Sequence, residues 1–152
     1  MRVLIQRVHS AEVAVASRTV GRIDRGLLVY LGIGVGDSID QAKWLGEKVS
    51  QLRIFEDEQG KMNMSVQDAR GGVLAIPNFT LLADARKGRR PAFVAAARPE
   101  QAEPLFEAFV SAIGASGLTV AKGVFGAEMT IRSDADGPVN IVLDAPTGGD
   151  ER

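Results

Sequence analysis

Apolar runs of strand length occupy the first third of the chain. Two stretches rich in β-forming residues, at residues 2–8 and 11–16, are followed by a continuous apolar run at residues 26–33. Short apolar runs bounded by turn residues are typical of strands, and residues 21–26 supply such a turn. The pattern therefore predicts three strands before the first helix.

Two later segments repeat their apolar residues at helical spacing. The first helix is expected over residues 39–52 with Ser38 as its N-cap, because its apolar positions recur every three or four residues: Ala42, Leu45, Val49 and Leu52. The second is expected to begin near Pro99 and to end at residues 114–117, with an apolar face made of Ala102, Leu105, Phe106, Phe109, Val110 and Ile113. Pro104 lies inside this second helix and is expected to bend it.

Strand patterns return between and after the helices. Residues 53–55 indicate a short strand, residues 118–134 one or two strands, and residues 139–145 a last one. The Asp-Gly-Pro segment at residues 136–138 indicates a turn. Strands that outnumber helices and are joined mostly by short turns predict an α+β fold of mainly antiparallel β-sheets with two packed helices, in β-β-α layers.

The apolar segment at residues 73–84 contains two residues that a strand does not favour. Pro77 cannot donate a hydrogen bond to a sheet ladder, and Asn78 is a poor strand former. The pattern therefore predicts a strand that is interrupted near its centre.

Composition narrows the possible chemistry. The 152 residues include no cysteine and one histidine, His9, and the formal net charge is −1. Disulfides, thiolate catalysis and a two-histidine metal site are thereby excluded, and we expect neither a metal nor a cofactor. No apolar run reaches 18 residues and residues 1–10 lack a signal-peptide pattern, so we expect a cytoplasmic protein that does not cross a membrane. We expect one domain over residues 1–145 and a flexible tail over residues 146–152.

Two segments, one rich in glycine and one rich in arginine, can each be compared with a ligand-binding motif. The glycines at positions 32, 34 and 36 do not match the G-x-G-x-x-G dinucleotide fingerprint, which favours a simple strand-to-helix turn. The basic segment at residues 86–91 is either a solvated loop or a surface that binds phosphates, and the sequence favours neither interpretation.

Taken together, seven motifs in order resemble the D-aminoacyl-tRNA deacylase family, also called D-tyrosyl-tRNA deacylase. The likeness spans residues 4–144, and its blocks are LIQRV (4–8), GLLVYLGI (26–33), RIFEDEQGKMN (53–63), NFTLLAD (78–84), KGRRPAF (87–93), GVFGAEM (123–129) and DGPV (136–139). The resemblance implies a homodimer that hydrolyses the ester between a D-amino acid, or mischarged glycine, and the 3′-terminal adenosine of tRNA.

The resemblance also implies roles for particular residues. The family's Gly-Pro pair is cis and reaches into the partner subunit's pocket, where it excludes L-amino acids; here it corresponds to Gly137 and Pro138. Arg7 matches the arginine that supports this pair. Phe125 and Met129 match residues that line the pocket for the terminal adenosine.

The catalytic motif of the family places main-chain donors beside the ester. Phe79 and Thr80 match this motif, with Thr80 at a position once proposed as a nucleophile, and the family is viewed as relying on backbone groups and on the substrate's own 2′-hydroxyl. Pro77 and Asn78 occupy the substrate-binding positions that precede them. The interrupted strand then corresponds to the point where a catalytic loop leaves the sheet.

The chain departs from the family pattern at both motifs. Pro77-Asn78 stands where the family has Ser-Gln, and Asn140 stands where the second motif ends in threonine; the first Asn of that motif is Asp134 or Ala135, depending on alignment. Two alternatives therefore stay open. One is a related editing deacylase with relaxed chirality, and the other is a non-catalytic dimeric protein that binds nucleic acid.

Overall fold

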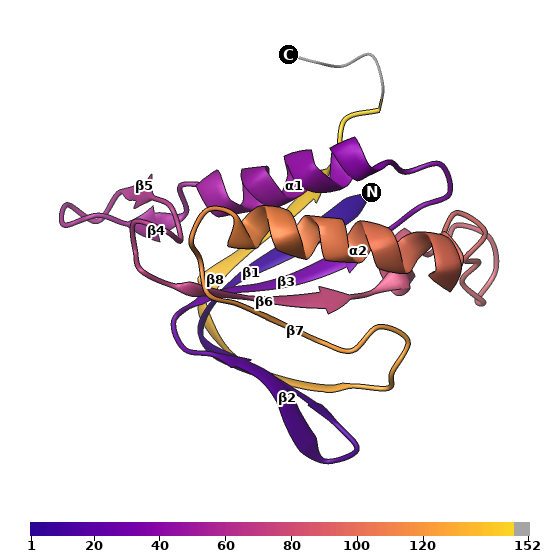
Figure 1. Cartoon of the computed structure of the whole chain (residues 1–152), viewed down its shortest axis with the longest axis horizontal. Coiled ribbons are helices and arrows are strands. Elements are labelled where there is room, and N and C mark those ends of the chain that lie inside the picture. The colour runs from indigo at the N-terminus through magenta and orange to yellow at the C-terminus, as the bar shows by residue number, and fades with distance from the viewer. Residues whose placement is uncertain (148–152) are drawn as a thin grey trace.

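A long first strand organises the sheet of this protein. The computed structural model describes residues 1–147 (Figure 1). Its elements in chain order are β1 (Arg2–Val15), β2 (Arg18–Ile23), β3 (Gly26–Gly32), α1 (Ile39–Gln51), β4 (Phe55–Glu56), β5 (Met62–Met64), β6 (Gly72–Pro77), the 3₁₀ helix η1 (Phe79–Leu82), α2 (Pro99–Gly114), β7 (Val120–Lys122) and β8 (Thr130–Asp144).

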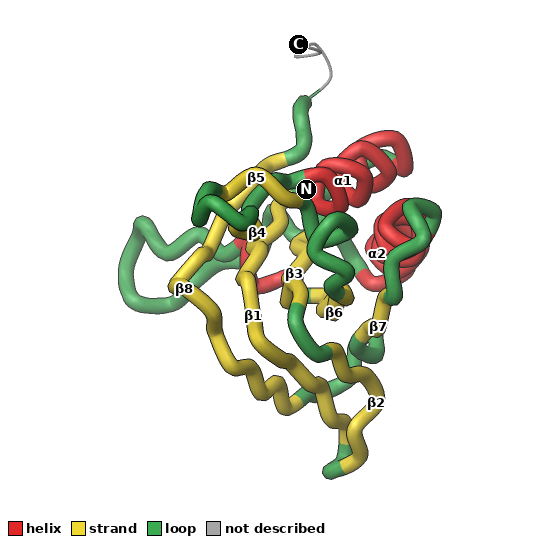
Figure 2. Tube along the Cα trace, turned by 90° about the vertical axis from the view of Figure 1, so that its left-hand side faces the viewer, coloured by secondary structure: helices red, strands yellow, loops and turns green. Residues whose placement is uncertain are grey.

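Both edges of β1 are paired along most of its length. One edge pairs antiparallel with β3 through the first half of the strand and with β2 through the second half. The other edge pairs antiparallel with β8 from Arg2–Asp144 to Ala14–Thr130, so β1 and β8 run side by side as two long curved strands (Figure 2). β1 is therefore the centre of the antiparallel part of the sheet.

The rest of the main sheet is parallel. β3 pairs with β6 and β6 pairs with β7, both in parallel, while β4 and β5 form a separate two-stranded sheet. Parallel neighbours need a crossover connection, and α1 and α2 lie in the two crossovers. The two helices pack side by side on one face of the sheet (Figure 1).

The helices begin where the sequence predicts. Ser38 and Gln41 form a reciprocal capping box at the start of α1, and Pro99 is the first residue of α2. α2 continues past Pro104 to Gly114. The α+β class and the two packed helices are confirmed, and the parallel pairs β3–β6 and β6–β7 are the part of the sheet that the strand pattern did not indicate.

Three local predictions are wrong. The two strands expected at residues 2–8 and 11–16 are one strand, β1 over residues 2–15, because β8 pairs along this segment. β2 lies where the sequence indicated only a turn, because its residues are mostly exposed and show little apolar pattern. Residues 136–138 lie inside β8 and do not form a turn between two strands.

The tail predicted at residues 146–152 begins within the described part of the chain. The predicted flexible tail falls mainly on residues 148–152, which lie outside the described residues, whereas the Pro146 carbonyl accepts a hydrogen bond from Gln41 Nε2 at 2.8 Å. Within residues 1–147 no helix is long and apolar enough to cross a membrane.

The contact between α1 and α2 depends on one small residue. Gly46 of α1 faces α2 so closely that an added Cβ would lie 2.8 Å from both the Phe109 carbonyl oxygen and Ala112 Cβ. The Phe109 carbonyl is part of the helix backbone and cannot rotate away from an added Cβ. The steric clash can therefore be relieved only if the two helices move apart. Phe109 is fully buried below this contact, and a separation would loosen the core that it fills.

We therefore expect Gly46→Ala to destabilise the protein by about 1–3 kcal/mol, because overpacking outweighs the gain in helix propensity. The matched control is Gly114→Ala in α2, where an added Cβ meets nothing within 4 Å. The control is expected to leave stability unchanged or to raise it by up to ~1 kcal/mol. Urea denaturation of both variants measures the difference, and equal effects of the two substitutions would contradict the close contact.

Candidate active site

A cavity of about 530 Å³ opens at the edge of the sheet where β3 and β6 end. The carboxyl ends of parallel strands meet at one edge, which is the usual place for a binding site in such sheets. Its lining residues come from the ends of these strands, η1, the segment before α2, the start of α2 and the loop between β7 and β8. They are Leu31, Ile33, Pro77, Asn78, Phe79, Phe93, Ala96, Ala97, Arg98, Pro99, Ala102, Phe125, Gly126, Ala127 and Met129.

Five residues that the family resemblance singled out line this cavity together: Pro77, Asn78, Phe79, Phe125 and Met129. Thr80 follows Phe79 on η1 and donates from Oγ1 to Asn78 Oδ1 at 2.5 Å. The lining does not include Arg7, Gly137 or Pro138 of the same chain. The predicted residues thus form two groups, one at the cavity and one on β1 and β8.

Aromatic rings form much of the cavity wall. Phe79 is 56% exposed, and its ring meets the edge of Phe93 with centroids 5.2 Å apart. Phe125 lies tilted against the buried ring of Phe106 at 6.2 Å. Flat apolar walls of this kind suit a planar, partly polar ligand such as a nucleobase.

Some lining residues were not singled out from the sequence. Phe93 belongs to the matched block at residues 87–93, and its apolar character directly after a basic segment was the available signal. Arg98 is an exposed cation at the cavity that directly precedes α2, and a single arginine before a proline carries no recognisable signal. The cavity therefore has an aromatic wall and a cationic rim.

The hydrogen bonds around Pro77 and Asn78 explain why β6 ends at Pro77. The Asn78 N–H donates to the Leu31 carbonyl of β3 at 2.8 Å. Neighbouring residues of a strand point their backbone groups to opposite sides, so the Pro77 nitrogen points toward β7. The last backbone bond on that side is from the Gly123 N–H to the Ala75 carbonyl at 2.9 Å, so pairing with β7 ends where Pro77 has no N–H to donate.

Beyond Pro77 the chain turns into η1 and presents backbone donors. The N–H groups of Leu81 and Ala83 bond back to the carbonyls of Asn78 and Thr80. Among the described residues, neither the Phe79 nor the Thr80 N–H has a backbone or side-chain acceptor outside η1, and the first turn of a helix offers none within it. The turn thus carries two adjacent donors that are open to a ligand.

The second group of predicted residues surrounds an irregularity in β8. Gln6 pairs with Asn140 and Val8 pairs with Ala135, so residues 136–139 are displaced from the β1–β8 ladder. Gly137 has φ +127°, an added Cβ would lie 2.6 Å from the Val139 nitrogen, and the Gly137–Pro138 peptide bond is cis. Gly137 and Pro138 are exposed.

Arg7 binds this displaced segment through Asp136. Its side chain is buried, Nη1 donates to the Ile54 carbonyl at 2.8 Å, and Nη2 donates to Asp136 Oδ1 at 3.4 Å. Nε lies 3.1 Å from Asp136 Oδ2 as an ion pair without the direction of a hydrogen bond. His9 Nε2 approaches the same carboxylate at 3.7 Å. The contacts between Arg7 and Asp136 therefore hold the residue directly before Gly137 against the interior of the sheet.

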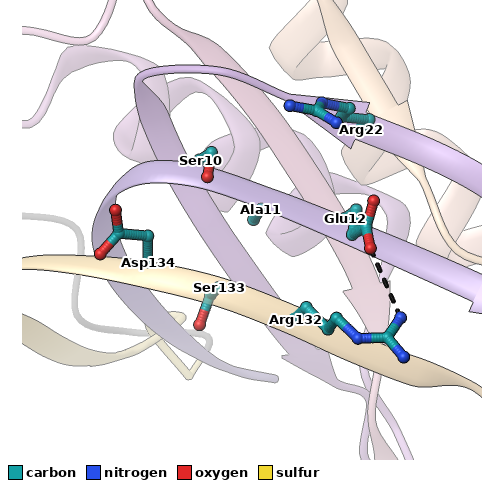
Figure 3. A pocket seen from close by; sticks show the side chains of 7 residues that line it. All are labelled: Ser10, Ala11, Glu12, Arg22, Arg132, Ser133 and Asp134. Carbon is teal, nitrogen blue, oxygen red and sulfur yellow. Dashed lines mark hydrogen bonds and ion pairs between the residues drawn. The ribbon is translucent and has the colours of Figure 1, made fainter.

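A smaller hollow of about 320 Å³ lies between β1, β2 and β8 (Figure 3). It is lined by Ser10, Ala11, Glu12, Arg22, Arg132, Ser133 and Asp134, and among them only Asp134 was singled out from the sequence, as one of two matches to the first Asn of the second family motif. Arg132 Nη1 meets Glu12 Oε1 at 3.4 Å across the hollow. Its two cations face two carboxylates, so it carries little net charge for a charged ligand.

Comparisons with known proteins agree on one family. The family described as D-Tyr-tRNA(Tyr) deacylase matches residues 4–144. The chain is 49% identical over 148 residues to the D-aminoacyl-tRNA deacylase of Desulforamulus reducens, covering 97% of this chain and 99% of the relative. It is 54% identical over 145 residues to the D-aminoacyl-tRNA deacylase of Koribacter versatilis, covering 95% and 97%.

Two solved structures share the fold. The c-Myc DNA Unwinding Element Binding Protein superposes with a TM-score of 0.89 at 36% identity, covering 97% of this chain and 100% of that one. A probable eukaryotic D-amino acid tRNA deacylase superposes with a TM-score of 0.79, covering 93% and 97%; at 17% identity it shows the fold alone.

The fold and these relatives define an ester hydrolase of tRNA proofreading. The chain belongs to the D-aminoacyl-tRNA deacylase family, as the sequence motifs predicted.

The buried contact between Arg7 and Asp136 generates a stability prediction. We expect Arg7→Met to destabilise the protein by about 2–4 kcal/mol, because it leaves Asp136 and the Ile54 carbonyl without their donor. A double-mutant cycle with Asp136→Asn, measured by urea denaturation, is expected to give a coupling energy of about 1–2 kcal/mol.

The matched control for this cycle is the ion pair between Arg132 and Glu12 on the same two strands, whose arginine side chain is 67% exposed. The cycle of Arg132→Met and Glu12→Gln is expected to give less than ~0.5 kcal/mol. A coupling energy for Arg7 and Asp136 no larger than this control would contradict the clamp.

Proposed function

We propose that the protein cleaves the ester that joins a D-amino acid, or glycine, to the 3′-terminal adenosine of tRNA, and that it rejects L-amino acids. The observation that carries this proposal is the cavity itself, whose lining combines the aromatic rings of Phe93 and Phe125 with Phe79, the first residue of the turn in which the Phe79 and Thr80 N–H groups have no acceptor among residues 1–147. A site with these features suits an aminoacyl adenosine, whose base needs a flat apolar wall and whose ester needs hydrogen-bond donors.

In the proposed reaction, the adenine lies between Phe125 and Met129, and the ester carbonyl faces the start of η1. Water adds to the carbonyl carbon, and the negative charge that develops on the carbonyl oxygen is stabilised by the Phe79 and Thr80 N–H groups. The bond from the carbonyl carbon to the 3′-oxygen then breaks, and that oxygen takes up a proton. The 2′-hydroxyl of the substrate accepts the proton that the attacking water loses and passes its own proton to this 3′-oxygen, so the products are the free amino acid and the 3′-hydroxyl, and the chain needs no side-chain acid or base.

Thr80 Oγ1 has a structural part in this scheme. It donates its proton to Asn78 Oδ1, which fixes the turn that aims the two backbone donors. A hydroxyl that donates in this way is not activated by a base, which supports positioning over nucleophilic attack as its role.

We further propose that the protein works as a homodimer in the cytoplasm, with Gly137 and Pro138 of one subunit completing the cavity of the other. The separation of the two residue groups supports this arrangement, since the displaced segment of β8 is exposed and the lining of the same chain's cavity leaves it out. A rigid backbone segment opposite the ester rejects an L side chain by steric conflict and admits a hydrogen atom. Glycine, which has hydrogen on both sides, is then also a substrate.

The direct test is deacylation of D-Tyr-tRNA, L-Tyr-tRNA and Gly-tRNA by the purified protein. We expect D-Tyr-tRNA and Gly-tRNA to be hydrolysed with a kcat/KM at least about 100-fold above that for L-Tyr-tRNA, because a steric conflict in a rigid site costs several kcal/mol. Equal rates for both tyrosine enantiomers would favour the related deacylase with relaxed chirality. Binding of tRNA without hydrolysis of any substrate would favour the non-catalytic alternative.

Mixed dimers test the shared site. Gly137→Ala and Phe125→Ala are each expected to inactivate the homodimer, the first because an added Cβ strikes the Val139 nitrogen and the second because the cavity loses an aromatic wall. In a heterodimer of the two variants, one cavity combines an intact wall with an intact Gly-Pro segment, so a refolded equal mixture recovers roughly one quarter of the wild-type activity.

Gly60→Ala is the matched control, since Gly60 also has positive φ (+74°) but meets nothing within 4 Å and does not line the cavity. This variant is expected to keep its activity. If the mixture of Gly137→Ala and Phe125→Ala recovers nothing while the subunits exchange, the Gly-Pro segment acts within its own chain.

A further inference from the structure

The basic segment between η1 and α2 is held at a defined place beside the cavity. Asp84 and Ala92 exchange two backbone hydrogen bonds of 2.8 Å, which close residues 85–91 into a hairpin loop. Phe93 follows directly and packs against Phe79 in the cavity wall. Figure 1 shows this loop projecting beyond η1, at the end of the sheet where α2 begins.

The loop carries three cations that the rest of the described chain does not neutralise. Arg86 is bound by Asp84 through Nε–Oδ1 and Nη2–Oδ2 contacts of 2.8 and 2.7 Å. The same contact lowers the pKa of the Asp84 carboxyl, so this pair is neutral overall at pH 7. Lys87, Arg89 and Arg90 are exposed, and none of them enters an ion pair within residues 1–147.

A polyanion is the partner that this arrangement fits. The whole chain has a formal net charge of −1, so its average field does not attract nucleic acid. Three unpaired cations within four residues produce a local positive field instead, and phosphates are bound by Lys and Arg without reading sequence. The cavity wall formed by Phe79 and Phe93 lies at the base of the same loop.

We propose that Lys87, Arg89 and Arg90 bind backbone phosphates of the tRNA acceptor stem, the duplex directly behind the 3′ end that enters the cavity. This inference rests on the proposed function, because it places the 3′ end at the cavity. The loop tip reaches at most roughly 14 Å from its base. The contacts are therefore limited to the end of the stem that lies nearest to the cavity.

The test compares the triple variant K87Q/R89Q/R90Q with the wild type in two assays. Binding of uncharged tRNA is followed by fluorescence anisotropy between about 50 and 300 mM salt. Deacylation is measured on full-length D-Tyr-tRNA and on 3′-D-tyrosyl adenosine, which has no duplex.

We expect the triple variant to bind tRNA on the order of 10–100-fold more weakly at ~100 mM salt, with a salt-dependence slope smaller by up to about 3. KM for full-length D-Tyr-tRNA rises in parallel while kcat stays the same. kcat/KM for 3′-D-tyrosyl adenosine changes by less than about twofold, because the loop lies outside the cavity lining.

Two controls separate the loop from general charge and from folding. The variant R18Q/K48Q/K61Q makes the same change in formal charge at exposed residues of β2, α1 and the turn between β4 and β5, away from the loop (Figure 1). It is expected to bind tRNA within twofold of the wild type. The charge-retaining variant R89K/R90K is expected to keep the wild-type salt slope.

Specific results would overturn the proposal. These are an unchanged salt slope in the triple variant, an equal loss in the R18Q/K48Q/K61Q control, or an equal loss on full-length and short substrates. Failure of the proposed function has a different signature. In that case the wild type hydrolyses neither D-tyrosyl substrate, while the anisotropy measurement still reports on the loop.

Discussion

The buried guanidinium of Arg7 is the group on which the displaced segment of β8 depends. A charge in the interior of a sheet requires a counter-charge and hydrogen-bond acceptors, and both come to Arg7 from outside β1. β8 supplies Asp136 and the segment before β4 supplies the Ile54 carbonyl. Asp136 is the first residue of the segment 136–139 that leaves the regular β1–β8 ladder, and Gly137 and Pro138 of the same segment are exposed.

The cavity has a different physical origin. It arises where the parallel strands β3 and β6 end at one edge of the sheet and α2 begins beside them. Nothing in that geometry requires the displaced segment of β8, and the two groups of residues do not share a cavity within one chain. A proposed homodimer accounts for both facts, because a two-fold axis can place the exposed segment of one subunit at the cavity of the other. The basic loop then lies on the outer side of the cavity, where the rest of the tRNA would approach.

The sequence predicted those features that depend on local pattern or on a motif. The apolar spacing of Leu45 and Val49 and the cap at Ser38 located α1, and the spacing of the motifs identified the family. The pairing partners were harder, because parallel and antiparallel strands have similar composition and because β1 is continuous only through its contact with β8. Phe93 and Arg98 reach the cavity through the long segment between η1 and α2, whose path no periodicity describes.

The departure at Pro77 and Asn78 is consistent with a site that works through its backbone. Where a side chain performs the chemistry, a change from Ser-Gln to Pro-Asn removes functional groups. Here the Pro77 nitrogen points to a side of β6 where pairing has ended, and the Asn78 N–H still bonds to Leu31. Asn78 also gives the turn an acceptor for the Thr80 hydroxyl. We infer that the substitution preserves the direction of the Phe79 and Thr80 N–H groups, and that this direction, more than the side chains that precede it, is the constraint on this part of the chain.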